Sequence, residues 1–138
     1  MSERGRRGDR PLRWLVGLVV AAILFVAAVV EPSPGIARYG PFGIFTRAIW
    51  LHAFGYAFLS LTLLYALLDT PDGPTVSPLV VPVIVVAYGT LLELVQLLIP
   101  YRTFAVGDIL ADAVGAVAVV AVWAYGRAAL SALGFRRS

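Results

Sequence analysis

Four long apolar stretches, separated by polar or Pro- and Gly-rich segments, dominate the pattern of the chain. Each is about 20 residues long, which is the length that an α-helix needs to cross the hydrocarbon core of a bilayer. The pattern therefore predicts an all-α membrane protein with four transmembrane helices in an antiparallel bundle. The predicted helices cover about 12–30, 46–68, 79–99 and 106–126.

The segments between these stretches are predicted to be loops. Residues 31–45 and 69–78 are dense in Pro and Gly, which favour turns over helices. Pro100 is expected to end the third helix, and residues 101–105 leave only a short connection to the fourth. A connection this short predicts that the third and fourth helices are antiparallel neighbours.

The boundaries define one transmembrane domain, residues 12–126, between a basic tail at 1–11 and another at 127–138. Pro11 suits the first turn of a helix, where its missing N–H costs little. A signal peptide is the alternative for the first stretch, given its basic start. Because the stretch is long for a signal peptide and no small-x-small cleavage site follows it, we expect a retained helix.

Composition supports this class. Of 138 residues, 60% are hydrophobic and only 14% are charged, against about 25% charged residues in soluble domains. Four spans nearly fill this sequence, so we expect no soluble catalytic domain. Cysteine is absent, which excludes disulfide and thiolate chemistry.

The basic residues are all arginines, and they predict topology rather than nucleic-acid binding. Eight lie near the two ends of the chain, five of them within residues 1–13 and three within 127–138, and the other three lie between the first and fourth helices. Cytoplasmic segments are enriched in Lys and Arg. We therefore expect a multi-pass protein of the cell membrane with both termini in the cytoplasm, and no nucleic-acid partner.

Three acids lie inside the predicted third and fourth helices: Glu93, Asp108 and Asp112. An acid at the centre of a membrane helix costs about 2.5 to 3.5 kcal/mol, so these groups should face one another or water. At a rise of about 1.5 Å per residue, Glu93, Asp112 and His52 each lie roughly 9 Å below the outer boundary. The sequence thus predicts one polar layer in the outer half of the membrane.

Helical spacing places further residues beside this layer. Tyr56 follows His52 by four positions, and Gln96 follows Glu93 by three, so each pair shares a helix face. Gly89 and Gly115 lie on the same faces and allow the helices to approach closely. Arg102, in the short connection, is expected to reach Asp108 or Glu93, or to hold an anionic group of a ligand.

These residues give two hypotheses. In the first, the layer is a site, with catalytic candidates His52, Glu93 and Asp112 and ligand-binding candidates Tyr56, Gln96, Arg102 and Asp108. In the second, the acids form a structural network that only specifies helix packing. A metal site built from the histidine and the acids is conceivable, but spacing alone does not select it, so we predict no metal and no cofactor.

The same residues resemble a known family. Glu93 and Gln96, then Pro100, Arg102 and Thr103, then Asp108, Asp112 and Gly115 follow the pattern of VanZ-like membrane proteins, and His52-x-x-x-Tyr56 is similar to a second element of that family. The similarity covers roughly residues 48–120. The chain departs from the family at Ala48 and Ile49, where an Asp-Lys pair is common, at Ala105 in place of serine, and at Asp112 in place of asparagine.

The family's name comes from a member linked to resistance to the glycopeptide teicoplanin, so the resemblance implies a role at the outer face of the membrane. We therefore expect an integral membrane protein that binds or modifies an envelope lipid, a lipid-linked sugar or a glycopeptide-type ligand. Its partners would be membrane lipids and such an amphiphilic ligand. Neither the reaction nor the oligomeric state follows from the sequence, and a noncatalytic membrane scaffold is the alternative.

Overall fold

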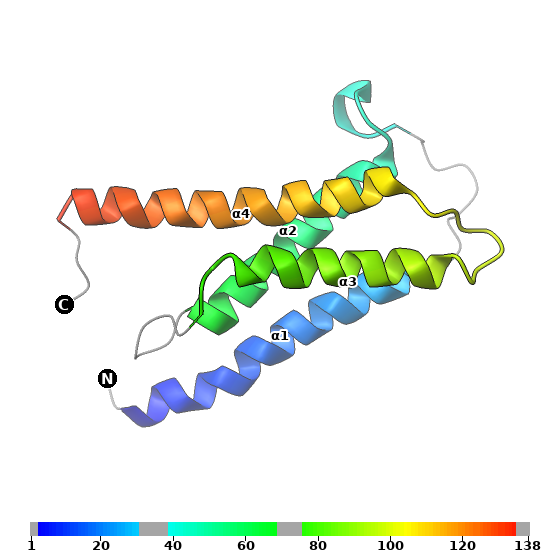
Figure 1. Ribbon diagram of the computed structural model, residues 1–138. Coiled ribbons are helices and arrows are strands. Elements are labelled where there is room, and N and C mark those ends of the chain that lie inside the picture. The colour runs from blue at the N-terminus through cyan, green and yellow to red at the C-terminus, as the bar shows by residue number, and fades with distance from the viewer. Residues whose placement is uncertain (1–2, 31–38, 69–75, 135–138) are drawn as a thin grey trace.

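The computed structural model describes residues 3–30, 39–68 and 76–134, and the long elements in these ranges are all helices. Figure 1 shows helices α1 (Glu3–Val29), α2 (Arg47–Leu68), α3 (Val80–Gln96) and α4 (Val106–Ala132). A short 3₁₀ turn, η1 (Pro41–Gly43), precedes α2. The predicted all-α class is confirmed for the described residues.

Three of the helices are long and apolar enough to cross a membrane. The qualifying segments are Pro11–Val29 in α1, Arg47–Leu67 in α2 and Val106–Ala132 in α4. Helix α3 is equally apolar in character but has only 17 residues. The described structure thus has the composition of a membrane protein.

The helix ends differ from the predicted boundaries in three places. Helix α1 begins at Glu3 and runs through Pro11, and α4 continues to Ala132, so part of each predicted tail is helical. Alanine and leucine after Gly126 are strong helix formers and extend α4. Helix α3 ends at Gln96 because the next N–H groups bond three residues back in tight turns that lead to Pro100.

Consecutive helices run in alternating directions, so the α3–α4 turn and η1 lie at one end of the bundle, and the start of α1 and the end of α4 lie toward the other (Figure 1). Helix α2 packs most extensively against α4. Gly115 permits this close approach, because a Cβ atom there would lie 2.1 Å from the carbonyl oxygen of Ala53. The prediction that glycine allows close packing on this face is confirmed.

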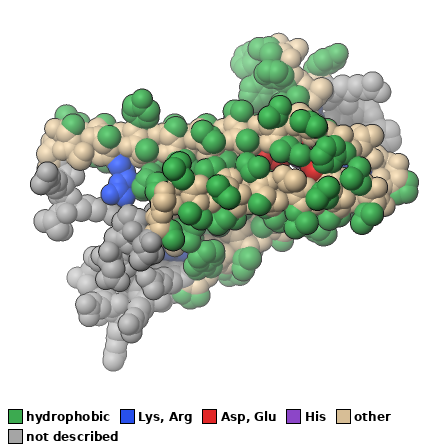
Figure 2. Space-filling view, in the orientation of Figure 1, with side chains coloured by type: hydrophobic (Ala, Val, Ile, Leu, Met, Phe, Trp, Pro, Cys, Tyr) green, Lys and Arg blue, Asp and Glu red, His purple; other side chains and the backbone are tan. Residues whose placement is uncertain are grey.

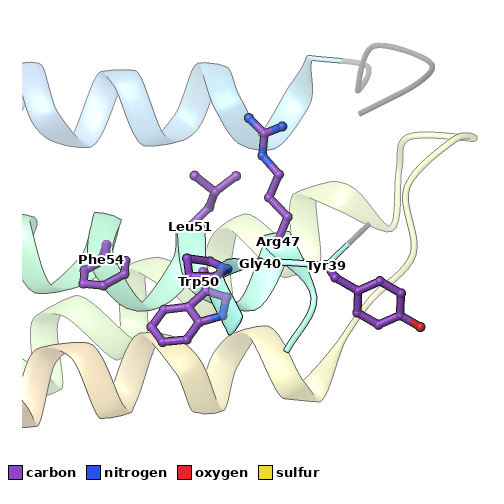
Figure 3. A pocket seen from close by; sticks show the side chains of 7 residues that line it. Tyr39, Gly40, Arg47, Trp50, Leu51 and Phe54 are labelled. Atoms are coloured by element: carbon purple, nitrogen blue, oxygen red, sulfur yellow. The ribbon is translucent and has the colours of Figure 1, made fainter. Parts of the chain in front are cut away.

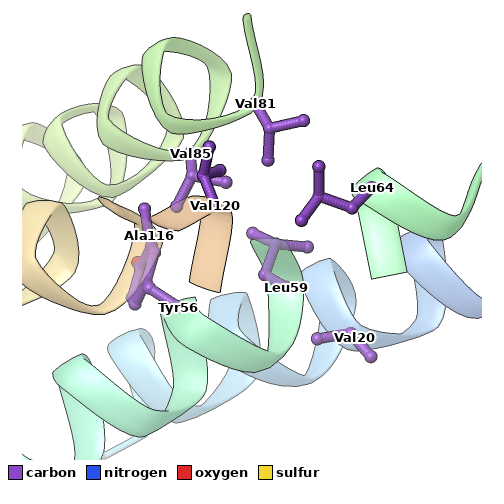
Figure 4. Packing of buried hydrophobic residues seen from close by; sticks show 8 residues of the cluster. All are labelled: Val20, Tyr56, Leu59, Leu64, Val81, Val85, Ala116 and Val120. Atoms are coloured by element: carbon purple, nitrogen blue, oxygen red, sulfur yellow. The ribbon is translucent and has the colours of Figure 1, made fainter. Parts of the chain in front are cut away.

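An apolar core fills the space among the four helices (Figure 4). It contains Val20, Tyr56, Leu59, Leu64, Val81, Val85, Ala116 and Val120. The outer surface is also apolar over much of the face seen in Figure 2. Large exposed apolar surfaces are a liability in water, whereas the hydrocarbon of a bilayer would cover them at no cost.

Candidate functional site

Four ionisable side chains meet near the end of the bundle that carries the α3–α4 turn. His52 lies in the second turn of α2, Glu93 in the last turn of α3, and Asp108 and Asp112 in the first turns of α4. We call these four residues the polar cluster. The contacts among these four residues show that they gather in one place.

The closest contact in the cluster joins α2 to α4. His52 Nδ1 lies 2.8 Å from Asp112 Oδ1, and Asp112 is completely buried. With Asp112 ionised, its carboxylate can only accept, and the imidazole donates its Nδ1–H in this bond. The ring also stacks on Tyr56, with the ring centroids 5.6 Å apart and the planes 5° from parallel. Together these contacts fix the orientation of the imidazole.

The other ring nitrogen of His52 faces the second aspartate. Nε2 lies 3.6 Å from Asp108 Oδ2, which is too long for a hydrogen bond but close for an ionic contact. The side chains of His52 and Asp108 are 20% and 17% exposed. The histidine therefore sits between a buried carboxylate and one at the edge of the cluster.

Glu93 is held by the backbone of the turn that follows it. Its Oε2 accepts a 3.0 Å hydrogen bond from the N–H of Ala105, the residue that precedes α4. The side chain is 1% exposed, yet Oε1 has no hydrogen-bond partner among the described residues. Asp112 Oδ2 is likewise buried without a partner there. Each such acceptor costs free energy unless something binds it.

One subset of the cluster has the arrangement of metal ligands. His52, Glu93 and Asp108 each offer one ligand atom, and the three atoms lie within 4.8 Å of one another. The set combines one nitrogen with carboxylate oxygens, which are ordinary ligands of divalent cations. Asp112 lies outside this set, on the far side of the imidazole.

Gly89 makes room for the buried carboxylate of Asp112. A Cβ atom at Gly89 would lie 2.1 Å from Asp112 Oδ2 and 3.1 Å from the ring of Tyr56. The face shared by Gly89 and Glu93 was visible in the sequence as a four-residue spacing. The structure adds that the glycine on this face accommodates a site residue from the facing helix.

Two of the predicted ligand-binding residues have other partners than expected. Arg102 donates through Nη2 to the carbonyl oxygens of Ala27, at 2.9 Å, and of Val30. Gln96 Nε2 donates to the carbonyl oxygen of Ala28 at 3.0 Å. In the described structure no ion pair joins Arg102 to either Asp108 or Glu93, so the expected pairing is corrected.

The end of α1 explains these partners. The last carbonyl groups of a helix have no partner inside it, and a cation near them is favourable. Tyr101 completes the set by donating its hydroxyl to the carbonyl oxygen of Val29 at 2.7 Å. Tyr88 donates to the carbonyl oxygen of Ala21 at 2.6 Å, about two turns before the end of α1. No local pattern in the sequence indicates that Tyr101 contacts α1.

Tyr56 is buried in the core, where it underlies the imidazole. The sequence predicts Tyr56 as a ligand-binding residue. Among the described residues no hydrogen bond joins its hydroxyl to Glu93 Oε1 or Asp112 Oδ2, which are both buried without a partner. Its position suits a support for His52, and direct contact with a ligand stays a prediction.

A shallow hollow of about 370 Å³ lies beside the cluster at the start of α2 (Figure 3). It is lined by Tyr39, Gly40, Pro41, Arg47, Trp50, Leu51 and Phe54. Trp50 and Phe54 stack with centroids 5.4 Å apart. None of the four cluster residues lines this hollow. Acidic side chains come to the surface in the seam between α3 and α4 (Figure 2).

Comparison with known proteins gives no relative: no protein-family profile, no curated protein and no solved structure matches the chain.

Proposed function

We propose that this chain is a VanZ-like integral membrane protein whose polar cluster binds, or acts on, an amphiphilic component of the cell envelope, either a lipid or a lipid-linked sugar. The observation that carries the proposal is the buried His52–Asp112 pair beside Glu93, whose Oε1 has no partner. Unsatisfied carboxylates at this depth are costly as structure alone. They are useful where a hydroxyl, an amine or a cation of a ligand must be bound.

In this proposal the residues have distinct roles. Glu93 and His52 exchange protons with the ligand, and Asp112 holds the imidazole in place through its 2.8 Å bond. Asp108, at the partly exposed edge, contacts the polar head of the ligand. Arg102 and Gln96 hold α1 against this end of the bundle, and direct binding of an anionic group by Arg102 would require it to leave the carbonyls of α1.

We further propose that all four helices cross the membrane. Helix α3 measures about 25 Å at 1.5 Å per residue, and the hydrocarbon core is about 30 Å thick. The turns at both ends of α3 supply the remaining length, and its direction opposes that of α4 (Figure 1). The arginine distribution then places both termini in the cytoplasm and the cluster near the outer face.

Single cysteines test this topology, because the chain has no cysteine of its own. We expect Thr103→Cys to react with a membrane-impermeant maleimide in intact cells. Ser2→Cys and Ser138→Cys should react only after the cells are made permeable. If α3 does not cross, Ser2→Cys and Ser138→Cys will be labelled from opposite sides, and the four-span proposal fails.

The ligand hypothesis is tested by comparing Glu93→Gln with Glu93→Leu in purified protein. Glutamine keeps an oxygen that accepts from the Ala105 N–H, whereas leucine leaves this N–H without a partner. Native mass spectrometry would measure retention of a polyprenyl-phosphate sugar, with phosphatidylglycerol as the control lipid. We expect Glu93→Gln to melt near the wild-type temperature and to lose selective retention of the lipid-linked sugar.

The alternative is a noncatalytic scaffold in which the cluster only specifies helix pairing. The 2.8 Å hydrogen bond between His52 and Asp112, which joins α2 to α4, is expected in a scaffold as well as in a ligand-binding site. A scaffold predicts that lipid retention is equal in the wild type, Glu93→Gln and Glu93→Leu, and that only Glu93→Leu loses stability. That pattern would reject the ligand hypothesis.

A further inference from the structure

We propose that the polar cluster is a binding site for a first-row divalent cation, such as Zn²⁺ or Mn²⁺, with His52 Nε2, Glu93 and Asp108 as its protein ligands. The three ligand atoms come from three helices and lie within 4.8 Å of one another. The inference concerns the residues of the proposed function, and it rests on that function only for the use to which the cation is put.

The orientation of His52 is the first argument. Its Nδ1 lies 2.8 Å from Asp112 Oδ1, and with Asp112 ionised it is the Nδ1–H that donates to this oxygen. A neutral imidazole held in this way presents the lone pair of Nε2 to the other side. A histidine that binds a metal usually donates its second ring nitrogen to a carboxylate, which fixes the ring and strengthens the ligand. The His52–Asp112 pair has this geometry.

The distances are the second argument. His52 Nε2 and Asp108 Oδ2 are 3.6 Å apart. A nitrogen and an oxygen bound to one Zn²⁺ at their usual bond lengths lie about 3.3 to 3.6 Å apart. Without a cation or a proton between these two atoms, the lone pair of Nε2 and the negative charge of the Asp108 carboxylate repel each other. The three ligand atoms lie within 4.8 Å of one another, so a carboxylate movement of about 1 Å would bring the two most distant atoms to the spacing of two ligands on one ion.

The buried oxygen of Glu93 is the third and independent argument. Glu93 is 1% exposed, and its Oε1 has no partner among the described residues. The second oxygen is already held by the N–H of Ala105, so the carboxylate is positioned before any ligand arrives. A bound cation would satisfy Oε1 and remove the cost of an orphaned buried acceptor.

Charge balance points in the same direction. The cluster contains three carboxyl groups and one imidazole, while the guanidinium of Arg102 donates to carbonyls of α1. Isolated charges are expensive at membrane depth. A divalent cation neutralises two carboxylates and leaves the His52–Asp112 bond intact.

The ligand types select the class of cation. Imidazole favours Zn²⁺, Fe²⁺, Ni²⁺ and Cu²⁺, and carboxylates also suit Mn²⁺, whereas Mg²⁺ prefers oxygen alone. A single histidine with two carboxylates therefore favours Zn²⁺ or Mn²⁺. Three protein ligands leave a position open for water or for an oxygen of a ligand.

Metal content is measured on the full chain, purified in detergent, stripped with a chelator and titrated with Zn²⁺ by calorimetry. We expect one Zn²⁺ per chain in the wild type and loss of that ion in His52→Gln and Glu93→Gln. Asp112→Asn should keep the stoichiometry but weaken the affinity about 10- to 100-fold, because Asp112 acts through the histidine. Mg²⁺ should not compete.

Tyr101→Phe is the matched control, since its hydroxyl lies near this end of the bundle but bonds to Val29. It should bind Zn²⁺ as the wild type does. Circular dichroism and gel filtration identify any variant that fails to fold, and Asp108→Asn is then the replacement ligand variant. No Zn²⁺ bound by the folded wild type, or an equal stoichiometry in folded His52→Gln and Glu93→Gln, would overturn the proposal.

The two proposals fail separately. Zn²⁺ binding without selective lipid retention would leave the metal site standing and reject the ligand hypothesis. If the chelator-stripped wild type still retains the lipid-linked sugar and binds no Zn²⁺ on titration, the ligand hypothesis stands and the metal site is rejected. In that case the cluster is balanced by protons instead of a cation.

Discussion

His52 Nδ1 lies 2.8 Å from Asp112 Oδ1, and this bond ties α2 to α4 beneath the α3–α4 turn. Asp112 is fully buried, so removing its side chain leaves the Nδ1–H of His52 without its partner. We expect Asp112→Ala to lower the free energy of unfolding by about 1 to 3 kcal/mol. Equilibrium unfolding in mixed detergent micelles measures the loss.

Asp108→Ala is the control for that measurement. Asp108 is 17% exposed and lies 3.6 Å from His52, without a hydrogen bond. Partly exposed ion pairs contribute about 0 to 1 kcal/mol, so its loss should be the smaller of the two. Equal losses in both variants would mean that the short bond adds no stability of its own.

Gly115 sets the distance between α2 and α4. A Cβ atom there would lie 2.1 Å from the backbone oxygen of Ala53, which cannot move aside as a side chain can. We expect Gly115→Ala to cost about 1 to 3 kcal/mol of unfolding free energy. Gly126, on the same helix, has nothing within 4 Å of its Cβ position, so Gly126→Ala should stabilise by about 0.5 to 1 kcal/mol.

Gly89 and Asp112 should be energetically coupled. A methyl group at Gly89 would meet Asp112 Oδ2 at 2.1 Å and push the carboxylate from His52. In an Asp112→Ala background that oxygen is gone, so Gly89→Ala should cost less. We expect a coupling of about 0.5 to 3 kcal/mol in a double-mutant cycle. Additive losses would show that the carboxylate does not occupy the space above the glycine.

Arg102 should stabilise the end of α1 more than the polar cluster. Arg102→Met keeps the apolar stem but removes the donors to the carbonyls of Ala27 and Val30. We expect a loss of about 1 to 3 kcal/mol and faster amide exchange in the last turn of α1. Arg127→Met is the control, because Arg127 lies over the ring of Trp123 at 4.8 Å and belongs to α4, which does not pack extensively against α1.

Exchange that is unchanged at α1 in Arg102→Met would contradict this role. Faster amide exchange around Asp108 and Glu93 instead would indicate that Arg102 stabilises these acids, as the sequence predicted. Metal or lipid binding, measured on the same sample, then shows whether the cluster depends on the arginine.

The helices and the membership of the cluster could be read from the sequence for clear physical reasons. Apolar runs of spanning length fix where helices lie, and four-residue spacing fixes which residues share a face. Counting depth from Pro100 and the short turn then aligned Glu93 with Asp112. His52 joined them because α2 starts at a comparable depth.

The partners of Arg102, Gln96 and Tyr101 were not predictable in the same way. These contacts depend on the axial position and the rotation of α1 relative to α3, and no local sequence pattern determines that register. The unsatisfied oxygen of Glu93 was also hidden, because it depends on which rotamer meets the N–H of Ala105. The spacing of residues along the sequence therefore predicted which residues form the cluster, but not the positions of the ligand atoms that favour a cation.

The hydrogen bonds at the end of α1 have a consequence for biogenesis. Their donors lie 68 to 75 residues further along the chain than their acceptors. Lipid supplies no donor for an exposed carbonyl within the hydrocarbon. The carbonyl groups at the end of α1 therefore gain these donors only after the segment 96–102 has been synthesised and has packed against α1.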